Sequence, residues 1–137
     1  MLKTYIAKKV EAKIRAAARR GAHALDLEAE DWFSQTNISL TTLDLRDCDL
    51  CVAGQLRASS YGPGASDSLN LITDKLCKAM GSFSEKLGFD AAEFVCEHYT
   101  DVHSPLRPRR FDRAYAILQD EWEIQIRQRR DAAKAAA

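Results

Sequence analysis

The strongest constraint on this chain is a run of apolar residues near its C-terminus that recurs at the spacing of an α-helix. Phe111, Tyr115, Leu118, Trp122 and Ile126 follow one another every three or four residues, as on one helical face. This is the clearest periodicity and the largest continuous apolar face in the sequence. A small bundle needs a long helix to close its core. We therefore expect Trp122 to be largely buried.

Shorter apolar patterns predict further helices. We expect residues 1–22 to form a basic amphipathic helix, because apolar residues recur there at helical spacing between lysines and arginines. Gly21 is expected to end or loosen this helix. Further helices are expected over 69–80, from Ser82 or Ser84 to Gly88, and from Asp90 through Cys96.

These patterns predict a mainly α fold, a small single-domain bundle of about five helices with irregular loops over residues 1–137. A weak alternation over 37–45 allows two short extended segments, too few for a sheet. The apolar stripe of the last helix ends before residue 127. We expect residues 127–137 to form a frayed tail rich in basic residues and alanine.

The chain has 137 residues, of which 46% are hydrophobic, as in folded globular proteins. No apolar run approaches the roughly 18 residues that a membrane-spanning helix requires. The first ten residues are too polar for a signal peptide. We therefore expect a cytoplasmic protein of a bacterial host cell, with no membrane partner.

One short stretch, Leu43–Leu56, combines several unusual features in the sequence LDLRDCDLCVAGQL. Leu43 and Leu45 alternate with polar residues, which favours an extended entry with one buried face. Asp47 and Asp49 are good N-cap residues for a short helix that follows. Gly54 is small enough to allow close approach of a neighbouring element. We expect Val52 or Leu56 to touch the final helix.

This stretch resembles a family of small proteins from actinobacterial phages and prophages, whose members read LDL, a polar turn, then C-V-L-G-Q-L-Y-G. The resemblance extends to Trp32, to Leu87-Gly88-Phe89-Asp90 and to the last helix, in all about half of the chain. The chain departs from the pattern at Arg57 and Ala58, where the family has tyrosine and glycine. The family has no established activity, so the resemblance implies a fold and a biological context but no mechanism.

The cysteines and histidines raise the question of a metal. Cys48 and Cys51 have the spacing of half a zinc site, which Cys96 and His98 could complete. The second half lacks the usual paired spacing, so inert structural or surface thiols are the favoured interpretation. Thiol redox chemistry is a further alternative, although the usual βαβ setting is missing. We expect no metal and no cofactor.

The zero net charge conceals a strong asymmetry along the chain. Residues 1–22 carry seven basic residues and one acidic residue, whereas 23–51 carry seven acidic residues and one basic residue. The simplest interpretation is that the basic helix lies near the acidic segment. The alternative is a nucleic-acid-binding regulator. Its candidate contact residues are Lys8, Lys9, Arg19, Arg20, Arg109 and Arg110.

No motif for catalysis is present: the sequence lacks Gly-x-Ser-x-Gly, His-Glu-x-x-His and a phosphate-binding glycine loop. We expect no enzymatic activity. The leading hypothesis is a non-enzymatic protein-interaction module, a phage accessory factor that binds a host or phage protein. The nucleic-acid-binding regulator and a small zinc-stapled module are the alternatives, and the oligomeric state is left open.

Overall fold

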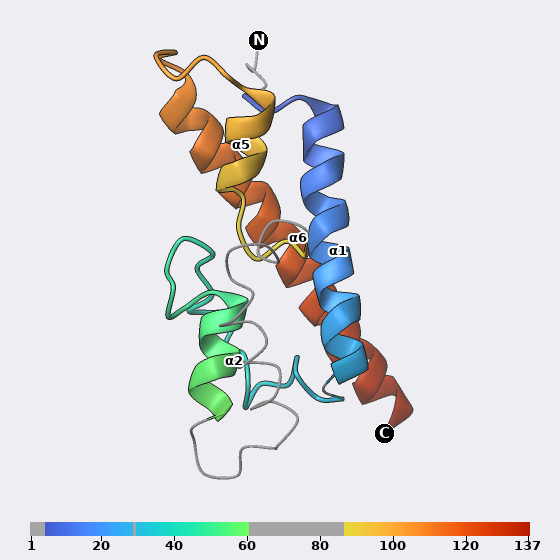
Figure 1. The fold of residues 1–137 in the computed structure, drawn as a ribbon. Coiled ribbons are helices and arrows are strands. Elements are labelled where there is room, and N and C mark those ends of the chain that lie inside the picture. Colours follow the sequence, from blue (N-terminus) through green and yellow to red (C-terminus); the bar gives the residue numbers. More distant parts are fainter. Residues whose placement is uncertain (1–4, 29, 61–86) are drawn as a thin grey trace.

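The longest helix is the one that the C-terminal periodicity predicts. In the computed structural model, which describes residues 5–28, 30–60 and 87–137, this helix is α6, Arg107–Ala136. The other helices are α1 (Lys8–Glu28), α2 (Val52–Ser60) and α5 (Ala92–His98) (Figure 1). The described residues contain no β-strand, so the predicted mainly α class is confirmed, with four helices there instead of about five. The helix predicted over 69–80, and most of the one predicted before Gly88, lie outside the described residues.

The two long helices, α1 and α6, run side by side in the same direction (Figure 1). Arg113 of α6 pairs with Glu11 near the start of α1, and Arg129 pairs with Asp26 near its end. Parallel neighbours cannot be joined by a short turn, so the chain between them must return to the same end of the molecule. Among the described residues, no helix is long and apolar enough to cross a membrane.

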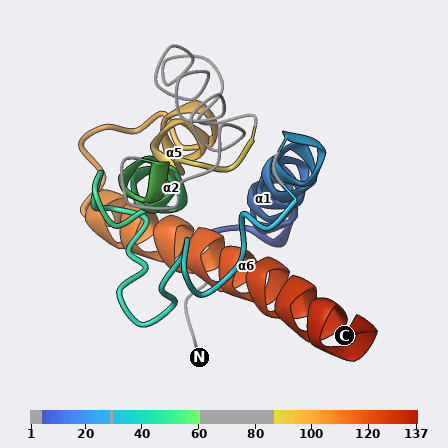
Figure 2. The same ribbon diagram turned by 90° about the horizontal axis from the view of Figure 1, so that it is seen from below.

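The short helix α5 runs opposite to both long helices. The chain enters it beside the middle of α1, where Gly88 lies against Ala18. It leaves beside the start of α1, where the hydroxyl of Tyr99 accepts a hydrogen bond from the Ala7 amide at 2.8 Å. Helices α1, α2 and α5 all lie on one side of α6 (Figure 2). One face of α6 therefore closes the core.

Trp122 lies at the centre of this core and is fully buried, which confirms the prediction. Its ring stacks on Phe89 at a centroid distance of 5.3 Å and meets Trp32 edge-on at 6.0 Å. Its indole N–H donates to the carbonyl of Gly88. Buried tryptophans need such a partner for their one polar atom. The aromatic packing thus joins two separate parts of the chain, around Trp32 and around Phe89, to α6.

Gly21 has a different role from the predicted one. The expected helix over 1–22 begins at Lys8 and continues through Gly21 to Glu28. A β-carbon at Gly21 would lie 1.9 Å from the carbonyl oxygen of Leu87 and 2.9 Å from the Trp122 ring. The glycine is therefore a contact point at which the chain before α5 touches α1. Local sequence could not reveal this, because the contact joins residues far apart in the chain.

The stretch Leu43–Leu56 folds as a series of turns followed by α2. Cys51, rather than Asp47 or Asp49, precedes the first helical residue, and its sulfur accepts the amide N–H of Gly54 at 3.3 Å. Gly54 packs against the carbonyl of Cys48, which lies 2.1 Å from where a β-carbon would be. The close approach that Gly54 permits is therefore within the stretch itself.

Helix α2 contributes to the core without lying along α6. Val52 and Leu56 are both fully buried. In the described parts of the two helices, no α-carbon of α2 lies within 8 Å of an α-carbon of α6. The loop before α2 is hydrogen-bonded to α6 through Gln119, while a side-chain contact of Val52 or Leu56 with α6 stays a prediction. Over 37–45, where two short extended segments were considered, the chain contains turns and no strand. The Gln55 side chain bonds both the N–H and the carbonyl of Ser39 there.

The predicted frayed tail is helical instead, because α6 continues to Ala136. Arg129 bonds Asp26 through two nitrogens, at 2.8 and 2.7 Å. Arg130 donates to the carbonyls of Phe33 and Ile38. These contacts hold the first part of the segment on the body, whereas residues 131–137 are exposed. The contacts of Arg129 and Arg130 were not predicted, because hydrophobic periodicity indicates buried apolar faces and not polar contacts.

Candidate functional site

An open groove lies between the loop that precedes α2 and the first half of α6. Its volume is about 520 Å³. One wall is the segment 41–46 with Leu50. The other is the α6 face formed by Asp112, Tyr115, Ala116 and Gln119. The walls of the groove therefore come from the stretch Leu43–Leu56 with the two residues before it, and from the C-terminal helix that the apolar periodicity predicted.

Gln119 fixes the loop wall to α6. Its side-chain oxygen accepts the Leu45 N–H at 3.1 Å, and its side-chain nitrogen donates to the Leu43 carbonyl. One amide can make both bonds because it carries a donor and an acceptor. Leu43 and Leu45 are buried while Asp44 between them is exposed, as the alternation predicts. The loop wall is therefore held on α6 by hydrogen bonds between the Gln119 side chain and the loop backbone, and by the burial of Leu43 and Leu45.

Arg46 closes one side of the groove. Its guanidinium lies 2.6 Å from the Asp112 carboxylate and 4.9 Å from the centroid of the Tyr115 ring. The Tyr115 hydroxyl donates to Asp90. Burial and the hydrogen bond to Asp90 raise the pKa of Tyr115, so the phenol stays neutral and keeps this bond. Loop, α6 and the start of α5 are thereby locked together around the groove.

Carboxylates dominate the charge around the loop wall. Asp44, Asp47 and Asp49 are all exposed. The Asp44 and Asp47 side chains accept backbone N–H bonds from the residues two positions later, as aspartates do in tight turns. Leu50, 37% exposed, adds an apolar side chain to the same wall. The groove therefore combines negative charge with one accessible apolar contact.

The cysteines of the loop differ in exposure. Cys48 is exposed, and Cys51 is buried at the start of α2. Burial raises the pKa of the Cys51 thiol. Cys51 is therefore shielded from reagents in solution, whereas Cys48 is accessible to them.

The candidate zinc ligands are not brought together. Cys96 lies exposed on α5, where its sulfur accepts a hydrogen bond from Arg107 at 3.5 Å. His98 lies at the end of α5. Within the parts of the chain that the structure describes, no group of three or more histidines, cysteines or acidic residues could hold a metal ion. Cys48 and Cys51 thus lack further ligands from Cys96 and His98.

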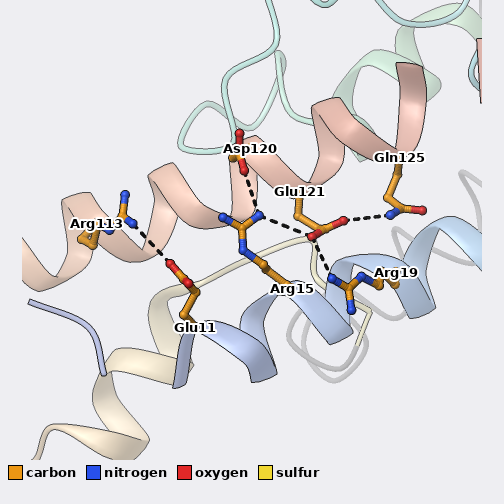
Figure 3. Close-up of polar contacts among 7 residues, drawn as sticks. All are labelled: Glu11, Arg15, Arg19, Arg113, Asp120, Glu121 and Gln125. Carbon is orange, nitrogen blue, oxygen red and sulfur yellow. Dashed lines mark hydrogen bonds and ion pairs between the residues drawn. The ribbon is translucent and has the colours of Figure 1, made fainter. Parts of the chain in front are cut away.

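Two arginines of the basic helix α1 pair with α6, whereas the simplest interpretation placed this helix near the acidic segment 23–51. Arg15 contacts Asp120 at 2.8 Å and Glu121 at 3.4 Å, and Arg19 contacts Glu121 at 3.3 Å (Figure 3). The Glu121 side chain is only 3% exposed, and Gln125 donates to its other oxygen at 2.8 Å. A buried carboxylate needs such partners. The charge of α1 is therefore partly structural.

The remaining residues proposed for nucleic acid divide into two groups. The exposed ones on α1 are Lys8, Lys9 and Arg20. Arg109 donates to the Tyr5 hydroxyl at 2.8 Å. The guanidinium of Arg110 lies 4.4 Å from the centroid of the Tyr99 ring. The two arginines of α6 thus make packing contacts, while the two lysines extend into solvent.

Three residues of α6 that make buried or part-buried polar contacts were not predicted from the sequence. Glu121 and Gln125 had a readable signal, because they are polar, four residues apart and lie inside the apolar face around Trp122. Gln119 had none, since a glutamine beside an apolar stripe is usually solvent-exposed. Its role depends on a loop more than seventy residues earlier.

Comparison with known proteins gives no assignment: no protein-family model, curated protein or solved structure matches this chain at a significant level.

Proposed function

We propose that this protein is a non-enzymatic protein-interaction module that binds its partner in the groove between the loop 41–50 and α6. The observation that carries the proposal is the way the groove is built. Gln119 bonds the loop wall to α6, and the Arg46–Asp112 ion pair joins the same two walls. A surface that is already ordered loses little conformational entropy on binding, so contacts made there contribute more fully to affinity.

Charge defines the kind of occupant. Asp44 and Asp112 line the groove against a single guanidinium, that of Arg46. Asp47 extends the negative charge along the loop, where Asp49 pairs with Arg57 at 3.6 Å. Leu50 offers an apolar contact. A segment of a partner protein that carries a lysine or arginine beside an apolar side chain matches both features. The resemblance to phage proteins makes a host or phage protein the partner to search for first.

Matched substitutions on α6 test this proposal. Ala116 and Ala132 are both exposed on α6, but only Ala116 lines the groove. Ala116→Arg places a long cationic side chain in the groove, whereas Ala132→Arg makes the same change outside it. We expect the wild-type protein and Ala132→Arg to retain the same protein from an extract of the source cells. Ala116→Arg should lose it, and binding of the purified partner should weaken as salt rises.

Equal retention by all three proteins would place the partner elsewhere and overturn the proposal. The nucleic-acid alternative predicts a different pattern, based on the exposed lysines of α1. Recovery would then be nuclease-sensitive and would fall with salt for duplex DNA. The double substitution Lys8→Ala and Lys9→Ala would abolish it, while Ala116→Arg would not.

A further inference from the structure

The residues from Asp47 to Cys51 form one closed turn. The Asp47 carbonyl accepts the Leu50 N–H at 3.2 Å and the Cys51 N–H at 2.9 Å. Residues three apart in such a helical turn lie on the same side, with their β-carbons roughly 5–6 Å apart. Cys48 and Cys51 are three residues apart in this turn. The Cys51 sulfur also points back into the turn, 3.6 Å from the Cys48 carbonyl oxygen.

We propose that Cys48 and Cys51 form a thiol–disulfide exchange pair whose co-reactant is a low-molecular-weight disulfide such as glutathione disulfide. The inference is independent of the proposed binding groove. The different exposure of the two thiols assigns their roles. Cys48 is exposed and meets the co-reactant, whereas Cys51 is buried beside it and reacts only within the turn.

The reaction has two steps. The Cys48 thiolate attacks one sulfur of glutathione disulfide, forms a mixed disulfide and releases one glutathione thiolate. The Cys51 thiolate then attacks the Cys48 sulfur, the bond to glutathione breaks, and a second glutathione thiolate leaves. Each thiolate released takes up one of the protons lost by the two cysteines. The cysteines are oxidised by two electrons and the glutathione disulfide is reduced to two thiols.

The local geometry indicates a readily reversible disulfide. A disulfide requires β-carbons about 3.5–4.5 Å apart, which is closer than residues three apart in a helical turn usually lie, so the turn has to tighten. Cys51 must also rotate away from the Gly54 N–H, which its sulfur accepts in the reduced protein. Both changes disfavour the oxidised form, and strained disulfides are more easily reduced. The pair should therefore be a labile redox couple rather than a permanent staple.

Glutathione buffers and peptide mapping test this pair directly. Trypsin cleaves after Arg46 and Arg57, so a single peptide, 47–57, contains both cysteines. After incubation of the folded protein with glutathione disulfide, this peptide should be about 2 Da lighter than its dithiol form, and excess reduced glutathione should restore it. The Gly54 amide should exchange its hydrogen faster in the oxidised protein.

Two substitutions separate the proposal from simple surface modification. Cys51→Ser keeps an N-cap side chain for α2 and should accumulate a glutathione adduct on Cys48. Cys48→Ser should leave Cys51 unmodified while the protein stays folded. Exposed Cys96 is the internal control and should carry the adduct. A stable adduct on Cys48 in the wild-type protein, or an unmodified 47–57 peptide when Cys96 is modified, would overturn the inference.

Discussion

The Trp122 side chain connects α6 to two other segments of the chain. Its ring contacts aromatic residues from two other segments, and its N–H reaches the backbone of Gly88. Gly88 itself has a φ of +70°, and a β-carbon there would collide with the backbone of Ala18. Only glycine combines that backbone conformation with so close a contact. The centre of the molecule therefore depends on one large residue and on neighbours that must be small.

We predict that Trp122→Ala destabilises the protein by about 3–5 kcal/mol, the usual range for removing a buried aromatic residue. Typical domains have only about 5–15 kcal/mol of stability, so this variant should be mostly unfolded or aggregated. Trp122→Phe keeps an aromatic ring but leaves the Gly88 carbonyl without its donor. Trp122→Phe should unfold at a urea concentration between those of the wild type and of Trp122→Ala. An unchanged unfolding midpoint for Trp122→Ala would contradict the packing.

At the scale of elements, the last turns of α6 show a polar anchor that follows an apolar stripe. Arg129 and Arg130 reach Asp26 and the carbonyls of Phe33 and Ile38, although the apolar face ends at Ile126. Burial lowers the pKa of Arg130, with a smaller contribution from Arg127. This end of α6 therefore ties down the chain that follows α1.

Two truncations test this anchor. Ending the chain after Asp131 removes only exposed residues and should leave the unfolding midpoint nearly unchanged. Ending it after Gln128 also removes Arg129 and Arg130. Because hydrogen bonds to charged groups contribute about 1.5–3 kcal/mol each, we expect a clear loss of stability by urea unfolding. Equal midpoints for the two truncations would show that the anchor is energetically neutral.

The whole molecule is held along α1 and α6 by ion pairs near both ends and in the middle. Asp26 is the clearest case. Burial opposes its ionisation, but hydrogen bonds from Arg129 and Trp32 outweigh burial and hold the pKa of Asp26 below the usual 3.8. Ionised Asp26 therefore stabilises the folded state above that value. This contribution is lost as the pH falls through 3.8 and then through the lower folded-state pKa.

Asp26→Asn should accordingly be less stable than the wild type at about pH 7, and the difference should shrink towards about pH 3. Urea unfolding at several pH values measures both proteins. A difference that stays constant with pH would mean that the ionisation of Asp26 does not contribute to stability. Asp131→Asn on the exposed end of α6 is the matched control and should show no such trend.

The sequence by itself determined the fold class, the long C-terminal helix and the burial of Trp122. These properties follow from apolar residues at helical spacing, which is a local pattern. It also indicated the buried leucines of the loop wall, Leu43 and Leu45, through their alternation.

Only the tertiary structure decided that α1 and α6 are parallel, that Arg15 and Arg19 pair with α6, and that Gln119 builds the groove. It also decided the role of Gly21, whose close contact is with Leu87. Each of these depends on residues more than sixty positions apart. Contacts of that kind arise from the packing of whole elements, and the identity of one partner says little about the other.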